Sequence, residues 1–354
     1  MITKKLALLS FGLLLGILSS CADKIDTSRV MQAVDYIDLP GPKSIYPSEL
    51  CRWKDQDCLI QQNRIFRVDG EALKAYSLPL PEKLNPIVRL GISQDKRLIG
   101  VSSKNAEGIF FIEDGDKWKE IPLPIKLSKN GIGVRIAAKG DKAVFKLKEK
   151  LYFWDGKKWL NKFYFADREM LYPHEILIGN DELYLAFNHG IHGGALAKLD
   201  LRNENDKVLT DDAVADIDFD SSGKLWCLTL SIFEGLQSLE NDKLVGQCGV
   251  DNFARTGVGN TTAKKTINWP LETANFQAMT SCDDDSFLLG GPSQGIFRYK
   301  DHKAVKLVAA WNKNYELDSI MQLENGKFAF TADGEGLGVL KENCLPRSVS
   351  FKRN

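Results

Sequence analysis

Short segments in which apolar and polar residues alternate recur along most of the chain. The clearest lies at 213–250, where VADIDFDSSGKLWCLTLS gives an alternating strand, a polar turn at Asp220–Gly223 and a second strand containing Trp226. GLQSLENDKLVGQ then adds two short strands around a turn at Glu240–Asp242. Alternation with a period of two, interrupted by turn residues at this spacing, predicts β-hairpins. The unit is therefore expected to be a sheet of four short strands.

Six further segments follow the same plan, which makes seven copies in total. They cover 58–78, 89–124, 134–165, 174–209, 278–308 and 319–345. A period of about 35 to 45 residues with four strands per unit is typical of β-propeller blades. One such sheet cannot bury both of its faces, whereas sheets packed around an axis cover one another. We therefore predict an all-β fold, a single β-propeller of seven blades, with six or eight blades as alternatives.

Closure of the ring needs terminal strands that share a blade. The copy at 58–78 is the weakest of the seven, and we expect it to form the seam together with RSVSF at 347–351. A β-sandwich is the structural alternative, but it would leave the repeat unexplained.

The repeat also resembles the propellers of bacterial sensor ectodomains, whose units run strand, D..G.LW..T, GL and a second turn. One unit matches this pattern at Asp220, Gly223, Leu225, Trp226, Thr229, Gly235 and Leu236. Another matches it in part at Gly326, Thr331, Gly336 and Leu337. The remaining units depart from the pattern. The resemblance therefore implies a fold over most of the chain and no particular activity.

The N-terminus has the layout of an export signal. Lys4 and Lys5 precede an apolar run of 13 residues, Leu6–Leu18, and small residues follow. This run is shorter than the roughly 20 residues that a membrane-spanning helix needs. The residues Leu18–Cys21 resemble a bacterial lipobox, which implies cleavage before Cys21 and acylation of that cysteine. An ordinary signal peptide with a chance cysteine is the alternative.

This interpretation divides the chain into a lipoprotein signal peptide at 1–20, a lipidated tether at 21–42 and one propeller domain at 43–354. The tether is expected because that segment is polar and carries Pro40 and Pro42. Ala22 stands where an aspartate would resemble an inner-membrane retention signal. We therefore expect a cell-envelope lipoprotein, on the outer membrane if the cell is Gram-negative.

The cysteine count agrees with export. Seven cysteines less Cys21 leave six, an even number suited to a compartment where disulfides persist. Cys51 and Cys58 lie close in sequence, so we predict a bridge between them. Four more could pair in any of three ways: Cys227, Cys248, Cys282 and Cys344. Six reduced, buried thiols are the alternative.

Charge and motifs exclude several classes of function. Removal of the signal would leave 45 basic and 47 acidic residues without a basic cluster, so we expect no nucleic-acid partner. The segment GVGNTTAKKT at 257–266 does not satisfy the phosphate-loop pattern, and no GxSxG nucleophile motif is present. We assign no catalytic residue and no cofactor.

Metal ligands are few. His189 and His192 lie in the glycine-rich segment FNHGIHGG and could share a metal if the loop curled, although a third ligand is not visible. The run CDDDS at 282–286 could hold calcium, but such runs are usually solvated turns.

Two groups of aromatic and basic residues differ in their expected roles. Trp118, Trp154, Trp159 and Trp226 recur at related places in the repeat, so we expect them to pack between blades. An insertion at 251–276 breaks the rhythm, and long loops of this kind are often functional. Our candidate partner-binding residues are Arg255, Lys264, Lys265, Trp269 and, outside the insertion, Trp311.

The sequence favours a binding or scaffolding lipoprotein that presents one propeller face to a protein, peptide or glycan partner. Fold alone does not fix function. The alternative is a propeller enzyme with an axial active site, either a metal-assisted lactone or ester hydrolase or a polysaccharide lyase.

Overall fold

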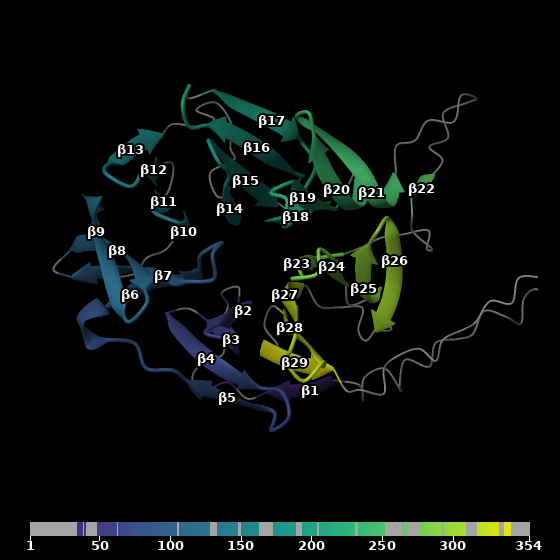
Figure 1. The fold of residues 1–354 in the computed structure, drawn as a ribbon, viewed down its shortest axis with the longest axis horizontal. Helices are drawn as coiled ribbons and strands as arrows, with labels where there is room; N and C mark the ends of the chain where they lie inside the picture. Colours follow the sequence, from purple (N-terminus) through teal and green to yellow (C-terminus); the bar gives the residue numbers. More distant parts are fainter. Residues whose placement is uncertain are drawn as a thin grey trace, which may run out of the picture.

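The computed structural model contains seven antiparallel β-sheets arranged around one axis (Figure 1). It describes residues 34–37, 39, 48–61, 63–104, 106–127, 133–147, 150–162, 173–188, 193–203, 205–230, 233–251, 265–267, 276–291, 294–308, 317–332 and 336–340. The one helical segment among them is the short 3-10 turn η2 (Glu82–Leu84). No helix in this part of the chain has the length and apolarity to cross a membrane. The predicted seven-bladed propeller is confirmed.

Each predicted copy forms one blade, and its strands run in sequence order from the axis outwards. Blade one consists of β2 (Ser48–Trp53), β3 (Gln56–Gln61), β4 (Arg64–Asp69) and β5 (Lys74–Ser77). Blade two consists of β6 (Ile87–Ile92), β7 (Leu98–Lys104), β8 (Glu107–Asp114) and β9 (Lys117–Lys126). Blade three consists of β10 (Val134–Lys139), β11 (Lys142–Leu147), β12 (Lys150–Trp154) and β13 (Trp159–Lys162).

The other side of the ring repeats this arrangement with two variations, a fifth strand in blade five and a borrowed strand in blade seven. Blade four consists of β14 (Glu175–Ile178), β15 (Glu182–Asn188), β16 (Gly194–Asp200) and β17 (Asp206–Thr210). Blade five consists of β18 (Val214–Phe219), β19 (Leu225–Thr229), β20 (Phe233–Glu240), β21 (Lys243–Asp251) and β22 (Lys265–Ile267). Blade six consists of β23 (Ala278–Ser281), β24 (Phe287–Gly291), β25 (Gly295–Lys300) and β26 (Lys303–Val308). Blade seven consists of β27 (Leu317–Gln322), β28 (Phe328–Ala332), β29 (Gly336–Leu340) and β1 (Val34–Ile37).

The ring closes at blade seven, where β1 pairs antiparallel with β29 from Val34 opposite Leu340 to Ile37 opposite Leu337. The expected seam was wrong in one respect, because the copy at 58–78 belongs to a complete blade. Residues 347–351 lie outside the described residues. The strand β1 also falls inside the segment expected to be a tether, so the propeller reaches back at least to Val34. Four residues are too few for alternation to reveal a strand.

Apolar side chains fill all seven seams between neighbouring blades. At the closing seam, Ile37 packs with Leu59 and Phe66 of blade one and Leu337 of blade seven. Because both faces of each blade are covered in this way, every sheet depends on its two neighbours.

The tryptophans at repeat-related positions belong to these seams, as predicted. Trp226 of blade five lies 5.0 Å from Phe287 of blade six, measured between ring centroids. Trp159 of blade three lies 6.1 Å from Phe110 of blade two. Trp118 packs between blades one and two, and Trp154 packs beside Trp159.

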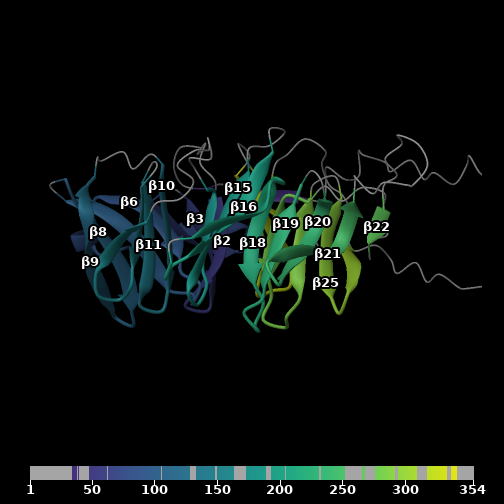
Figure 2. The same ribbon diagram turned by 90° about the horizontal axis from the view of Figure 1, so that it is seen from above.

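The turns between first and second strands and between third and fourth strands lie at the same end of the ring, which we call the hairpin face (Figure 2). Several are two-residue turns with positive φ at both positions, such as Lys54–Asp55, Asn241–Asp242 and Asp301–His302. This is the type I′ geometry, whose twist matches that of the flanking strands.

The predicted bridge between Cys51 and Cys58 is absent, although β2 and β3 place the two residues directly opposite each other. Both thiols are buried in the apolar seam between blades one and two. Burial raises the pKa of Cys51 and raises that of Cys58 to about 11, which disfavours the thiolate that disulfide formation requires. Among the described residues, Cys227, Cys248 and Cys282 also form no disulfide. Cys344 lies outside them.

Loss of β1 should open the ring. A variant lacking residues 22–37, expressed without the lipid anchor, would leave β29 as an unpaired edge and remove Ile37 from its seam. We expect its free energy of unfolding to fall by about 3 kcal/mol or more, from the loss of one large buried side chain and one strand pairing. Denaturant unfolding would measure this. A matched variant lacking only residues 22–32 keeps β1 and should unfold like the parent; equal stability of the two truncations would contradict the assignment.

Candidate functional site

The innermost strands carry charged residues inside otherwise apolar segments. Arg89 interrupts IVRLGI in β6, Arg135 lies in β10, Glu175 begins β14, and Asp216 and Asp218 lie in β18. All five residues are partly buried, and several apolar residues beside them, such as Leu90, Val134 and Ile217, are fully buried. The five lie on the innermost strands of blades two to five, which surround the axis (Figure 1). We call the cations the basic side of the axis and the carboxylates the acidic side.

The acidic side joins blades four, five and six through hydrogen bonds to backbone. The Ile217 N–H donates to Glu175 Oε2 at 2.9 Å. The Met279 N–H donates to Asp216 Oδ2 at 2.8 Å, and the Ser281 N–H donates to Asp218 Oδ2 at 3.2 Å. Each carboxylate thus bonds the inner strand of the next blade around the ring.

The pKa values of these carboxylates are all raised. Burial raises the pKa of Glu175 well above its ordinary value, and the neighbouring Asp216 raises it further. Burial also raises the pKa of Asp216 to about 7 and raises that of Asp218. Three acids in close proximity cannot all ionise cheaply, so a proton between Glu175 and Asp216 replaces one charge with a hydrogen bond.

The basic side lies on blades two and three. Arg135 donates from Nε to the Pro173 carbonyl at 3.2 Å and from Nη1 to the Val134 carbonyl at 3.3 Å. Burial and the nearby charge of Arg89 lower the pKa of Arg135. Glu49 of β2 is the adjacent acid; burial raises its pKa, and Arg89 partly offsets that rise. Cations and carboxylates therefore occupy different sectors of the ring.

One turn crosses the axis at the hairpin face. Gln94, in the β6–β7 turn of blade two, accepts a hydrogen bond from the Ile178 N–H at 2.8 Å and donates to the Ile178 carbonyl at 3.2 Å. Lys96 of the same turn forms a 2.9 Å ion pair with Asp283 of blade six. Blades two and six are not neighbours in the ring, so the Lys96–Asp283 contact crosses the axis, whereas Gln94 reaches blade four past the inner strand of blade three, where its N–H donates to the Ala138 carbonyl. A cavity of about 280 Å³ lies beside Lys96, between the first turns of blades five and six.

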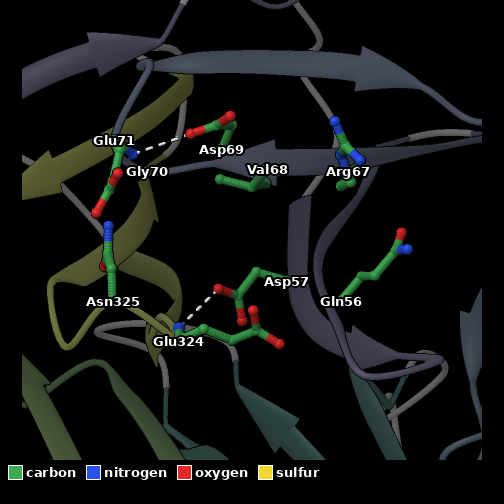
Figure 3. Close-up of a pocket in the computed structure, with 9 residues that line it drawn as sticks. All are labelled: Gln56, Asp57, Arg67, Val68, Asp69, Gly70, Glu71, Glu324 and Asn325. Atoms are coloured by element: carbon green, nitrogen blue, oxygen red, sulfur yellow. Dashed lines mark hydrogen bonds between the residues drawn. The ribbon is translucent and has the colours of Figure 1, made fainter.

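A larger pocket of about 540 Å³ lies on the hairpin face between blades one and seven (Figure 3). Blade one supplies Gln56, Asp57 and the segment 67–71, and blade seven supplies Glu324 and Asn325. A Cβ on Gly70 would collide with Leu323, so glycine is needed for the blade-one turn to approach blade seven so closely.

The lining of this pocket is acidic. It has four carboxylates, from Asp57, Asp69, Glu71 and Glu324, and one cation, Arg67, which lies at the end away from Glu71 (Figure 3). Asp57 accepts a hydrogen bond from the Glu324 N–H at 2.8 Å, and Asp69 accepts one from the Glu71 N–H at 3.1 Å. These two acids stabilise the local structure. The exposed carboxylates of Glu71 and Glu324 have no bonding partner among the described residues, so they are available to a ligand.

Most residues predicted to form a site lie outside the described part of the chain. This applies to Cys21, His189, His192, Arg255, Lys264, Trp269 and Trp311. Lys265 begins β22, which pairs with β21, so part of the insertion extends blade five and is not a loop. In the run at 282–286, Asp284 accepts hydrogen bonds from Ser286 and pairs with Lys300, while Asp283 pairs with Lys96. No group of three or more metal-ligating side chains occurs in the described ranges.

Neither the charged axis nor the pocket was predicted from the sequence. The sequence indicates the axis only through single charged residues within apolar inner strands, such as Arg89 and Arg135. Such a signal becomes interpretable only when the strand order is known, because the same residue on an outer strand would face solvent.

No protein-family model matches the chain, and no curated protein matches it. Several solved structures, in contrast, match the chain. A catalytically inactive virginiamycin B lyase from Staphylococcus aureus, solved with quinupristin, has a TM-score of 0.54 and 15% identity over 87% of this chain and 98% of that one. The extracellular domain of a one-component system from B. thetaiotaomicron has a TM-score of 0.53 and 13% identity, covering 88% of this chain and 40% of that one. YCF48 bound to D1 peptide has a TM-score of 0.51 and 14% identity, covering 89% and 97%.

At these identities the likeness establishes the fold. The chain is a seven-bladed β-propeller whose structural neighbours include sensor ectodomains, in agreement with the resemblance of its repeats. It spans less than half of the sensor ectodomain chains that it matches.

The acidic side predicts a specific pH dependence of stability. A carboxyl whose pKa is raised on folding stabilises the folded state at pH values below its pKa in the unfolded chain. This stabilisation is lost as the pH rises towards and through the pKa in the folded state. For the acidic side, the loss is expected between about pH 4 and pH 7. Glu175→Gln mimics the protonated acid, since its amide can accept from Ile217 and donate to Asp216. We expect the variant to exceed the parent in free energy of unfolding by about 1 to 2 kcal/mol at pH 8, and to match it near pH 4.5.

Denaturant unfolding of both proteins between pH 4.5 and 8 would measure this difference. Glu107→Gln, at the exposed start of β8, is the control and should show no such trend. A difference between Glu175→Gln and the parent that stays constant with pH would contradict proton sharing at this site.

Proposed function

We propose that this protein is a membrane-anchored lipoprotein of the cell envelope whose propeller binds a segment of a partner protein. The observation that carries the proposal is the acidic pocket between blades one and seven, an open site with unused carboxylates from two blades. Propeller neighbours from extracellular sensor domains support an extracytoplasmic location. The neighbour described as YCF48 bound to D1 peptide supports peptide binding by this fold.

Charge selects the kind of segment. Asp57 is paired with Arg52 at 3.0 Å, so three carboxylates remain against the Arg67 guanidinium, and the pocket favours a segment that presents lysine or arginine. Its volume of about 540 Å³ is within the range of ligand sites and is sufficient for a few side chains. We therefore assign the pocket to a basic segment of the partner.

The anchor part of the proposal rests on the segment Leu18–Cys21 and the export signal before it. Acyl chains on Cys21 would hold the protein stably at a membrane surface, where two or more chains are needed for lasting attachment. If the cell is Gram-negative, we place the protein on the outer membrane. The insertion residues, with Lys265 and Trp269 among them, are proposed as a second contact.

Attachment should depend on Cys21. In the Cys21→Ser variant no acylation can follow, so we expect the protein to leave the membrane fraction and be recovered as unlipidated material. Fractionation of cells, with mass spectrometry of the mature N-terminus, would measure this. Cys282→Ser leaves the lipobox intact and should fractionate like the parent. An N-terminal residue other than an acylated cysteine in the parent would disprove the anchor.

Partner capture tests the pocket. With a photo-crosslinking amino acid at Gln56, on the pocket rim, we expect a discrete adduct in intact envelopes. The pair Glu71→Lys and Glu324→Lys should reduce its yield at least about threefold, because two favourable charge contacts become repulsive. Asp116→Lys, an equally exposed acid of another hairpin-face turn, should leave the yield unchanged. An adduct insensitive to the pocket reversal, or one consisting of glycan, would refute the assignment.

A further inference from the structure

The basic side of the axis has unused hydrogen-bonding capacity. Among the described residues, no hydrogen bond or ion pair engages the partly buried Arg89 guanidinium. Arg135 uses Nε and Nη1 on the carbonyls of Pro173 and Val134, which leaves Nη2 without a partner in the same set. These two bonds fix the Arg135 side chain in place. The site thus contains one positioned guanidinium and one free guanidinium on the inner strands of adjacent blades.

Arg89 and Arg135 place two positive charges in this sector, with Glu49 as the adjacent acid. Glu49 interacts electrostatically with Arg89. The two residues nevertheless form no ion pair within 4.0 Å in the described structure. Mutual repulsion between neighbouring guanidinium groups in a partly desolvated site costs free energy, and a bound anion would offset that cost.

We propose that Arg89 and Arg135 bind the terminal carboxylate of a peptide on the propeller axis. The planar fork of a guanidinium fits a carboxylate with two parallel hydrogen bonds, and a second guanidinium adds charge and orientation. The Glu49 carboxylate, which interacts electrostatically with Arg89, would accept the amide N–H that precedes the terminal residue.

The acidic side of the axis selects against a more highly charged ligand. Glu175, Asp216 and Asp218 occupy the next two blades around the ring and would repel a phosphate dianion more strongly than a carboxylate monoanion. This site is separate from the acidic pocket on the hairpin face, and it does not require the partner proposed above.

Small probes test this assignment in the unmodified propeller. N-acetyl-dialanine carries both the carboxylate and the N–H, its C-terminal amide lacks the carboxylate, and acetate lacks the N–H. By calorimetric titration, we expect the free acid to bind at least about tenfold more tightly than either of the other probes, the ratio expected for a charge-assisted hydrogen bond. Inorganic phosphate should bind more weakly than the free acid.

Variants distinguish the site from general attraction to a basic surface. Arg89→Ala removes only the free guanidinium and should weaken binding of the free acid about tenfold or more without altering the unfolding midpoint. Arg64→Ala, at the exposed start of β4, should leave binding unchanged. Absence of binding by the free acid, equal binding of acid and amide, tighter binding of phosphate, or undiminished binding by Arg89→Ala would each overturn the proposal.

Discussion

The inner strands of a propeller each have one unpaired edge that faces the axis. Each has a sheet neighbour on one edge only, as the outermost strands do, and no ladder joins the inner strands of different blades. Backbone groups on the other edge must therefore find partners elsewhere, because unpaired polar groups away from water are costly. Here side chains of the preceding blade supply them: Glu175 bonds the Ile217 N–H, Asp216 the Met279 N–H and Ser319 the Leu50 N–H. The axis is consequently lined by polar side chains that the fold itself requires.

That requirement explains why carboxylates remain in an environment that raises their pKa. A carboxylate accepts strong hydrogen bonds from backbone N–H groups, which stabilises the ionised form, while burial and the neighbouring acids destabilise it. Proton sharing between Glu175 and Asp216 keeps both bonds to the backbone and avoids the second charge. The seams farther from the axis need no such compromise, because they are filled by apolar clusters from adjacent blades.

Local patterns in the sequence were sufficient to predict the blades. Asp220 shows why. Its carboxylate accepts hydrogen bonds from the Ser222 and Lys224 N–H groups and from Trp226 Nε1. The motif D..G.LW therefore specifies both the turn and the tryptophan that packs beside it. Contacts between distant segments could not be predicted in this way. The partners Asp216 and Met279 lie 63 residues apart, and β1 pairs with a strand some 300 residues later. The cysteines illustrate the same limit, since their spacing suggested a bridge between Cys51 and Cys58 but could not reveal the apolar seam in which both thiols are buried.

The ring geometry also explains how one small domain holds two sites of opposite charge. Each blade contributes one or two residues to the axis, so a sector of the ring takes its sign from only two blades: Arg89 and Arg135 make one sector basic, while Glu175 and Asp216 make the next acidic. Residues at the hairpin face belong to turns and are free of the inner-strand requirement, which allows Glu71 and Glu324 to remain unpaired. Attraction falls off within about 10 Å at ordinary ionic strength, so the axis and the hairpin face can recognise different groups independently. A partner that engaged both would gain affinity from the fixed spacing between them without any change in the propeller.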